Sequence, residues 1–443
     1  MNALGSRPAD MDKPQYVYGI DVPPPLRYVL LYGLQWAIVI FPALIIVATL
    51  GSRALRLPVD QEVHFFQLLL LLSGLFTVIQ TLWGHRYPIL DGPSTALLLT
   101  FIVLAPYGAE IIQGGTIAGG ILLMALVFSG KLHRLLAYAT PNVVGVILML
   151  IAFSLLPHLM ASVTGKDALQ PNGSAGILAL SFLLVLAMAA FSHWIEGFWK
   201  TLSLLLGMLL GTLLFFLLEP LDSSPLGAAP WVSLPSMRFL TPPRFYWPAV
   251  AAMAASYLAV VVNTLGSLHG VAAITDTERL PTAVTRGVFW NGAAGICCGT
   301  LGIVGLVSYS MSPGVILANR VASRYAVACG GILLVVAAFV PKLAAVLAMI
   351  PAPVVGAALC VAMGAQVGAA MGIVAEGDLS GRDYFVVGVP VLMGTLVSFL
   401  PSSLLESIPI HFRVFLGNGL VVGIFLVLFL EHFLLRKKRP REE

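Results

Sequence analysis

The chain has 443 residues, of which 59% are hydrophobic and only 10% are charged, and its formal net charge is +4. Soluble globular proteins carry about 25% charged residues, so this chain has too little polar surface to cover a water-facing globule of its size. The composition excludes a soluble enzyme and predicts an integral membrane protein whose first partner is the lipid bilayer. No nucleic-acid partner is expected.

The first 26 residues are polar and rich in proline, and they lack the apolar h-region of a cleaved signal peptide. We therefore expect residues 1–26 to form a cytoplasmic tail and the first span to direct insertion. Four cysteines lie in apolar stretches without the spacing of a metal site, so they are expected to be small packing residues. No metal or cofactor is predicted. The cysteines are Cys297, Cys298, Cys329 and Cys360.

A helix needs about 20 apolar residues to cross a bilayer. Two stretches, 87–107 and 304–322, are apolar but interrupted by Gly, Pro and Ser. Counting both, the sequence predicts an all-α membrane protein with fourteen transmembrane segments. The full-length candidates are 27–50, 65–84, 113–133, 141–163, 175–195, 200–219, 246–272, 284–303, 327–348, 352–374, 384–400 and 411–435.

The distribution of Lys and Arg predicts the orientation. An even number of crossings puts both termini on one side, and the basic residues of the tail 436–443 indicate that this side is cytoplasmic. The basic residues on the opposite side fall mostly in its longer loops. We therefore predict a multi-pass protein of the cell membrane with both termini in the cytoplasm. The loop residues that agree with this orientation are Arg86, Lys131, Arg134, Lys200, Arg279, Arg286, Arg320, Arg324 and Arg382.

The spans form two sets of seven, related by a shift of roughly 215 residues. The sequence Pro-Asn-Val-Val-Gly opens the span 141–163, and Ala-Pro-Val-Val-Gly opens the span 352–374. An odd number of crossings in each set makes the second set inverted relative to the first. The alternative is that such a sequence is merely a common start for a membrane helix.

The two interrupted segments occupy equivalent places in this repeat. Asp-Gly-Pro-Ser-Thr surrounds Pro93, and Ser-Met-Ser-Pro-Gly surrounds Pro313. Proline is favoured in the first turn of a helix, so each segment is predicted to be an extended strand followed by a half-helix. The starts of the two half-helices would present N–H groups and the positive ends of their dipoles to a substrate near the midplane. Two ordinary helices kinked by proline are the alternative.

At this point the chain resembles the nucleobase–ascorbate transporter family, also called nucleobase:cation symporter-2. The resemblance lies in Gly-Leu-Gln at 33–35, Tyr-Pro-Ile-Leu-Asp-Gly-Pro-Ser at 87–94, the stretch from Thr140 to Pro157, Asn-Gly at 291–292, and 314–324. Together these motifs run through the whole membrane region.

The resemblance implies transport of nucleobases such as uracil or xanthine by an elevator-like movement, and a homodimer. It implies a core domain made of 27–139 and 246–350 and a gate domain made of 140–220 and 351–435. The remaining parts are the tail 1–26, an extracytoplasmic loop at 221–245 and the basic tail 436–443.

The chain departs from the family where a base would bind. Trp36 stands where the family has His, Thr95 where an aromatic residue is common, and Asn263 where a carboxylate usually grips the base. Each Ser could instead serve helix packing, Trp36 could be space-filling, and Met311 could be a wall residue. The predicted substrate contacts are Gln35, Trp36, Ser94, Thr95, Asn263, Ser267, Tyr309, Ser310, Met311 and Ser312.

No Asp or Glu is expected well inside a core span, because Asp91 stands only at the start of its segment. Coupling to protons through a carboxylate is therefore not expected, and His269 is either a packing residue or a proton carrier. Uncompensated half-helix dipoles leave a second hypothesis open, a transporter of small anions similar to the sulfate-transporter (SulP) family. An enzyme is not expected, since the sequence contains no GxSxG or HExxH motif.

Overall fold

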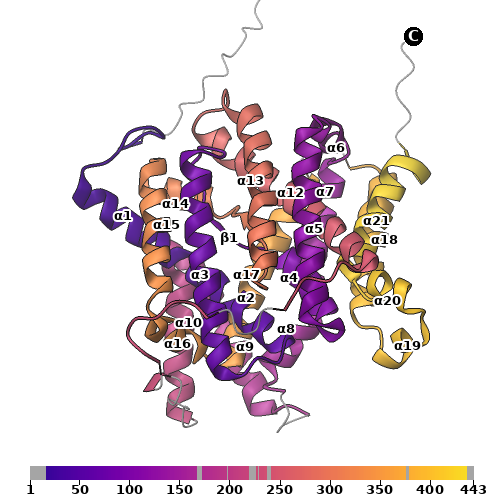
Figure 1. The fold of residues 1–443 in the computed structure, drawn as a ribbon, viewed down its shortest axis with the longest axis horizontal. Helices are drawn as coiled ribbons and strands as arrows, with labels where there is room; N and C mark the ends of the chain where they lie inside the picture. Colours follow the sequence, from indigo (N-terminus) through magenta and orange to yellow (C-terminus); the bar gives the residue numbers. More distant parts are fainter. Residues whose placement is uncertain are drawn as a thin grey trace, which may run out of the picture.

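The computed structural model describes residues 16–166, 172–196, 198–218, 226–227, 229–236, 241–375 and 379–436. Across these residues the chain is almost entirely helical, with one two-stranded sheet near the centre of the molecule (Figure 1). This confirms the predicted all-helical class. The expected tails fall largely outside the described residues, as does part of the loop 221–245.

The first half of the chain carries the first broken segment between two long helices. Its elements are α1 (Leu26–Val39), α2 (Phe41–Ala54), α3 (Val59–Leu82), β1 (Asp91–Pro93), α4 (Thr95–Leu104), η1 (Ala105–Tyr107), α5 (Ala109–Phe128), α6 (Leu132–Leu136), α7 (Pro141–Ser154), α8 (Leu156–Val163), α9 (Ala175–Trp194) and α10 (Phe198–Leu218).

The second half carries the second broken segment in the equivalent place. Its elements are α12 (Trp247–Ile274), α13 (Leu280–Thr300), β2 (Leu306–Ser308), α14 (Ser312–Asn319), α15 (Arg324–Ala338), α16 (Pro341–Ala348), α17 (Ala352–Ala375), α18 (Gly381–Ser398), α19 (Ser402–Ser407), α20 (Ile410–Leu416), α21 (Gly419–Phe429) and η2 (Leu430–Leu434).

Among the described residues, seven helical spans are long and apolar enough to cross a membrane, and an eighth is bent by 90° between α15 and α16. The count of fourteen crossings remains a prediction. The prediction of single helices over 327–348 and 411–435 is wrong. Pro341 begins α16 after the bend, and the second stretch is divided between α20 and α21. Proline lacks the N–H that would continue a helix through such a point.

The packing of the long helices is related across the two halves. α3 packs along α15, and α13 packs along α5. In the predicted repeat α3 corresponds to α13 and α5 to α15, so these two contacts would be equivalent. Glycines allow the close approach: a Cβ on Gly74 of α3 would lie 2.5 Å from the carbonyl oxygen of Gly331 on α15. A larger residue at either position would force the helices apart.

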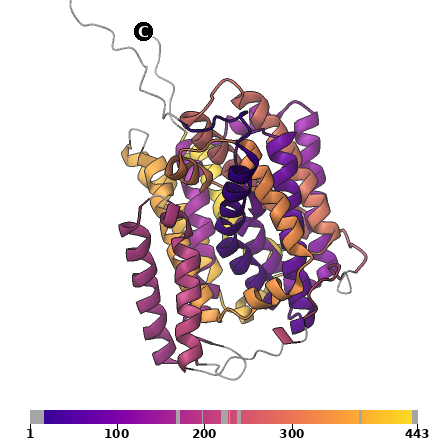
Figure 2. The same ribbon diagram turned by 90° about the vertical axis from the view of Figure 1, so that its left-hand side faces the viewer.

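The remaining helices form a second group. α7 packs against α17, α18 and α21, while α9 packs against α10 and α17. The α9–α10 pair stands at one edge of the molecule (Figure 2). Contacts of α10 with α14, α2 with α17, and α12 with α21 join this group to the helices around the sheet. The division into core and gate domains stays a prediction.

The segment before α1 is tied to the second half of the chain. Tyr18 forms a parallel β-bridge with Val321, just after α14. Asp21 lies 2.9 Å from an Arg279 nitrogen and 2.7 Å from an Arg324 nitrogen. Arg279 and Arg324 therefore meet at one end of the molecule, which is the end predicted to face the cytoplasm.

Candidate functional site

The centre of the site is the antiparallel pair of β1 and β2, in which Gly92 lies opposite Val307. The Ser94 N–H donates to the Gly305 carbonyl at 2.8 Å, and the Tyr309 N–H donates to the Leu90 carbonyl at 2.8 Å. Each strand thereby satisfies the other's backbone groups. That is required of any extended chain in a region without water.

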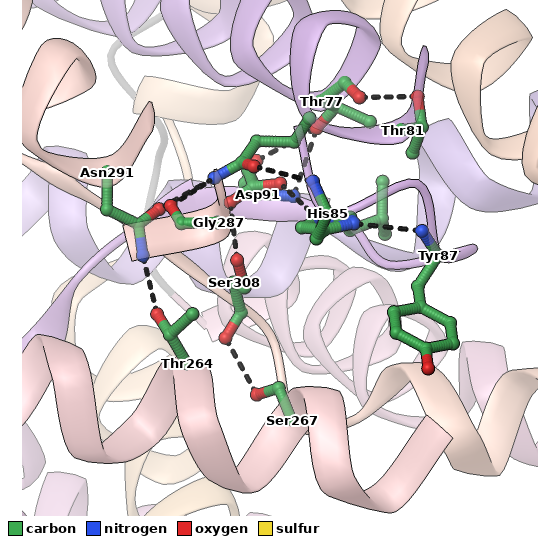
Figure 3. A network of polar contacts seen from close by, with 12 residues as sticks. Thr77, Thr81, His85, Tyr87, Asp91, Thr264, Ser267, Gly287, Asn291 and Ser308 are labelled. Atoms are coloured by element: carbon green, nitrogen blue, oxygen red, sulfur yellow. Dashed lines mark hydrogen bonds and ion pairs between the residues drawn. The ribbon is translucent and has the colours of Figure 1, made fainter. Parts of the chain in front are cut away.

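Hydroxyl groups from neighbouring elements tie this strand pair to the helices around it (Figure 3). The Thr77 hydroxyl on α3 accepts from the Asp91 N–H at 3.0 Å. The Ser267 hydroxyl on α12 donates to the Ser308 carbonyl at 2.8 Å. The Ser312 hydroxyl accepts from the Leu90 N–H at 3.3 Å. The strands are therefore held by α3, α12 and α14 together.

Each strand leads into a short helix, as predicted. Ser94 is the N-cap of α4, and its hydroxyl accepts from the Leu97 N–H at 3.3 Å. This cap occupies one of the N–H groups that a substrate could use. α14 begins at Ser312 without a side-chain cap, and its second residue is Pro313. Of the two helix starts, α14 has the one without a side-chain acceptor.

The structure divides the ten predicted contacts into accessible and buried side chains. Ser310 and Met311 are exposed, Met311 to 41%, while Thr95, Asn263 and Tyr309 are half-buried. They lie at the start of α4, at the start of α14 and on the adjoining part of α12. Gly266, one turn after Asn263, faces open space, since a Cβ there would meet nothing within 4 Å. These side chains are the accessible members of the predicted set.

Buried members of the predicted set have structural contacts instead. Gln35 is 2% exposed and accepts from the Asn319 amide at 2.8 Å, at the far end of α14. Trp36 is 1% exposed and packs against Gly330 of α15. Ser267 and Ser312 are fully buried, and their hydroxyl groups form the hydrogen bonds to the strand segments described above. This burial favours the space-filling interpretation for Trp36 and a positioning role for the two serines.

Sequence reasoning missed a buried carboxylate. Asp91 is 1% exposed; one of its oxygens accepts from the Ser308 hydroxyl at 2.8 Å, and the other lies 3.5 Å from His85 Nε2. The expectation of no acidic group inside the core is therefore wrong. Asp91 was placed at the edge because it opens its segment, but that segment starts inside the protein. The expectation of a packing role for His269 is also wrong, since this side chain is exposed.

A second missed feature is a buried amide chain that joins three helices. The Gln80 amide of α3 donates to the Asn291 carbonyl oxygen at 3.0 Å, and the Asn291 amide donates to Thr264 at 2.6 Å. Buried amides need such partners, because an unpaired polar group in the interior is costly. The Asn-Gly motif at 291–292 was the signal in the sequence. These hydrogen bonds hold α13 against α3 and α12 beside the site.

The described residues also contain a polar pocket of about 480 Å³ at the end that holds Asp21. The Arg279 guanidinium donates to Asp21 and Asp276 and thereby holds the pKa of both carboxyls below their usual range. The two remain ionised at neutral pH. The pocket is lined by Asp21, Gly84, His85, Arg86, Asp276, Glu278, Arg279, Thr282, Ala283 and Arg286.

An apolar groove of about 620 Å³ lies elsewhere, between α5, α12 and α21, and Phe245, Trp247 and Phe425 contribute to its wall. It has few polar groups to orient a solute. The ten predicted contacts line neither this groove nor the polar pocket.

Comparisons with known proteins agree with this architecture. A model of the Permease family, for xanthine and uracil permeases, matches residues 27–403. The uric acid permease PucK of Bacillus subtilis is 27% identical over 93% of this chain and 96% of its own length. The nucleobase transporter PlUacP of Paenibacillus larvae is 26% identical over 94% and 96%, and the uracil permease of Escherichia coli is 27% identical over 76% and 77%.

Two solved structures share the fold at low identity. The transmembrane domain of the cyanobacterial bicarbonate transporter BicA has a TM-score of 0.60 at 14% identity, covering 84% of this chain and 96% of that chain. The murine anion transporter Slc26a9 in its inward-facing state has a TM-score of 0.62 at 12% identity, covering 92% of this chain and 68% of that chain. At such identities the likeness concerns the fold alone.

Proposed function

This chain belongs to the Permease family of nucleobase–ascorbate transporters, and we propose that it carries nucleobases across the membrane. It is a multi-pass membrane transporter and not an enzyme. The family match over residues 27–403 is the observation that carries the proposal. Uric acid, xanthine and uracil are the first substrates to test, because relatives along the whole chain are named for them.

The accessible side chains support a planar substrate with hydrogen-bonding groups along its edge. Asn263 offers both a donor and an acceptor, which matches the N–H and C=O groups along the edge of a nucleobase. Ser310 and Thr95 add hydroxyl groups, and Met311 offers an apolar surface for the face of a ring. We propose that these four side chains contact the base. Tyr309 would then border the site, since its hydroxyl already donates to the Pro93 carbonyl at 3.0 Å.

Movement of the core domain against the gate domain would carry the base across, in the manner of an elevator. The contacts support this division, because the strand pair packs against α2, α3, α12 and α13, and α4 packs mainly against α2 and α12. The other half-helix, α14, lies between α12 and α10 of the gate domain. The gate helices meet the core helices mainly through α10, α17 and α21. We also propose a homodimer formed through the gate domain, whose α9, α10 and α18 expose many large apolar side chains.

A transporter of small organic or inorganic anions is the second hypothesis. The uncapped start of α14 supports it, since helix N-termini bind anions. The ten predicted contacts include no basic side chain to balance the charge of a small anion such as sulfate. The transport assay below distinguishes the two.

Uptake of labelled uric acid, xanthine and uracil into proteoliposomes tests the proposal. The wild-type protein should accumulate at least one base with saturation, and Asn263→Ala should raise KM about 10-fold or more, since losing one or two hydrogen bonds costs about 1–3 kcal/mol. Ser129→Ala is the control, because its exposed hydroxyl donates only within α5, to the Leu126 carbonyl. Saturable uptake of bicarbonate or sulfate with no uptake of any base would favour the second hypothesis.

A further inference from the structure

The His85–Asp91 pair has no role in the proposed binding of the base, although both side chains are almost fully buried. Asp91 Oδ1 accepts from Ser308, whereas Asp91 Oδ2 and His85 Nε2 have no hydrogen-bond partner among the described residues. These two unsatisfied atoms face each other at 3.5 Å. Buried polar atoms are rarely left unsatisfied without a functional reason.

The hydrogen-bond pattern assigns the protons of the pair. The Tyr87 backbone N–H donates to His85 Nδ1 at 3.0 Å, so Nδ1 carries no hydrogen. A neutral ring then has its hydrogen on Nε2, directed at Asp91 Oδ2. Protonating Nδ1 as well would break the bond to Tyr87. An additional proton is therefore accommodated on the Asp91 carboxylate rather than on the imidazole.

The groups around Asp91 leave its charge without a counter-ion. The Ser308 hydroxyl of β2 donates to the carboxylate, whereas Thr77 of α3 bonds to the backbone N–H and C=O of Asp91. Tyr309 lies beside the carboxylate, and His85 is its one ionisable partner within salt-bridge distance in the described part of the chain. The nearby guanidinium of Arg279 is engaged by Asp21 and Asp276. A buried carboxylate without a cation is expensive in a membrane protein, and binding a proton removes that cost.

His85 lies between the carboxylate and the polar pocket, and its side chain is fully buried. It lines the polar pocket of about 480 Å³, together with Arg86, Asp276, Glu278 and Arg279. Its other edge faces Asp91 (Figure 3). One side chain therefore separates the carboxylate from the pocket.

The carboxylate in turn is linked to the proposed base site. The Ser308 hydroxyl that donates to Asp91 belongs to the last residue of β2, directly before Tyr309, Ser310 and Met311. The proton on Asp91 would change the acceptor strength of the oxygen that holds Ser308. A change at Asp91 thus reaches the start of α14 through one hydrogen bond and the backbone.

We propose that His85 and Asp91 form a proton-binding site that couples proton entry to transport of the base. A water molecule in the pocket gives up one proton, and this proton binds Asp91 Oδ2. The charge of the His85–Asp91 pair thereby changes from −1 to zero. The site lies at a different place from Asn263, where the resemblance led us to expect a carboxylate. The proposal rests on the proposed transport of nucleobases.

Two transport assays on the same proteoliposomes test it. Counterflow of a base measures exchange without net proton movement, while an imposed pH gradient measures proton-driven accumulation. With one proton per base, a gradient of about one pH unit supports about tenfold accumulation. The wild type should show both activities, and Asp91→Asn, which resembles the protonated acid, should keep counterflow and lose accumulation. His133→Gln is the control and should keep both, because this exposed histidine bonds to the Gly130 carbonyl of its own loop.

Infrared difference spectroscopy between neutral and acidic pH supplies a readout that needs no substrate. The wild type should gain a protonated-carboxyl band that Asp91→Asn lacks, and His85→Gln should alter its position and slow proton-driven uptake severalfold. If Asp91→Asn does not fold, the proton site is tested by two other results: the presence of the band in the wild type and the change of that band in His85→Gln. Two results would overturn the proton site without affecting the proposed nucleobase transport. One is normal proton-driven accumulation in both variants, and the other is a wild type that shows counterflow but no response to the pH gradient. Absence of counterflow for every base would instead refute the proposed function.

Discussion

Replacing Gly92 by alanine should destabilise the centre of the protein. A Cβ at this position would lie 2.7 Å from Cζ and from the hydroxyl oxygen of Tyr309, and 2.8 Å from Ile40 Cδ1. Carbon atoms pack at about 3.5–4.0 Å, so the ring must move by nearly 1 Å. The Ile40 methyl group can turn aside, but the Tyr309 ring is anchored by its hydrogen bond to the Pro93 carbonyl.

The expected cost follows from these two terms. Overpacking of a buried site costs about 1–3 kcal/mol, and loss of the Tyr309 hydrogen bond adds about 1 kcal/mol. Since the entropy of unfolding scales with chain length at about 2.1 cal/mol/K per residue, each kcal/mol lowers Tm by about 1 °C in this chain. Gly92→Ala should therefore lower the unfolding temperature of the purified protein by about 2–4 °C.

Thermal unfolding in detergent, followed by size-exclusion chromatography, measures this shift. Gly266→Ala is the matched control, because its Cβ meets open space and alanine favours a helix. A double-mutant cycle with Tyr309→Ala isolates the clash, and the coupling energy should reach at least about 1 kcal/mol. Equal unfolding temperatures for Gly92→Ala and Gly266→Ala, or a coupling energy near zero, would refute this reasoning.

Two further predictions concern the surroundings of the site. Asn291→Val should remove the hydrogen bond to Thr264 and one of the two made by the Gln80 amide, which keeps the Gly287 carbonyl as an acceptor. It should cost about 1–3 kcal/mol, seen as a lower Tm, and an unchanged Tm would contradict this. Asp21→Asn should speed amide exchange of residues 16–22 at neutral pH, because it removes the ion pair with Arg279. As the pKa of Asp21 is lowered in the folded protein, its contribution is complete above the usual aspartate value of about 4 and is lost as the pH falls through the lowered value. Wild-type exchange in this segment should therefore approach that of the variant only in acid, and high salt should reduce the difference between them.

The sequence by itself determined the architecture of this protein. The apolar stretches, the loop charges and the shift of roughly 215 residues predicted a membrane protein with two equivalent halves. The prolines at 93 and 313 located the two strand-plus-half-helix segments correctly. These features could be read because a bilayer imposes length and composition on every element that crosses it.

Only the tertiary structure decided which polar residues are accessible. Trp36 and Ser312 looked like candidate ligands but are buried, and Asp91 looked peripheral but lies in the interior beside His85. The first residue of a segment is not necessarily near the membrane surface, because a segment can start inside the protein. Asp91 bonds to Ser308, which lies 217 positions away, and to Thr77 on a helix of the same half. The environment of this carboxylate therefore forms only once both halves have folded around the strands.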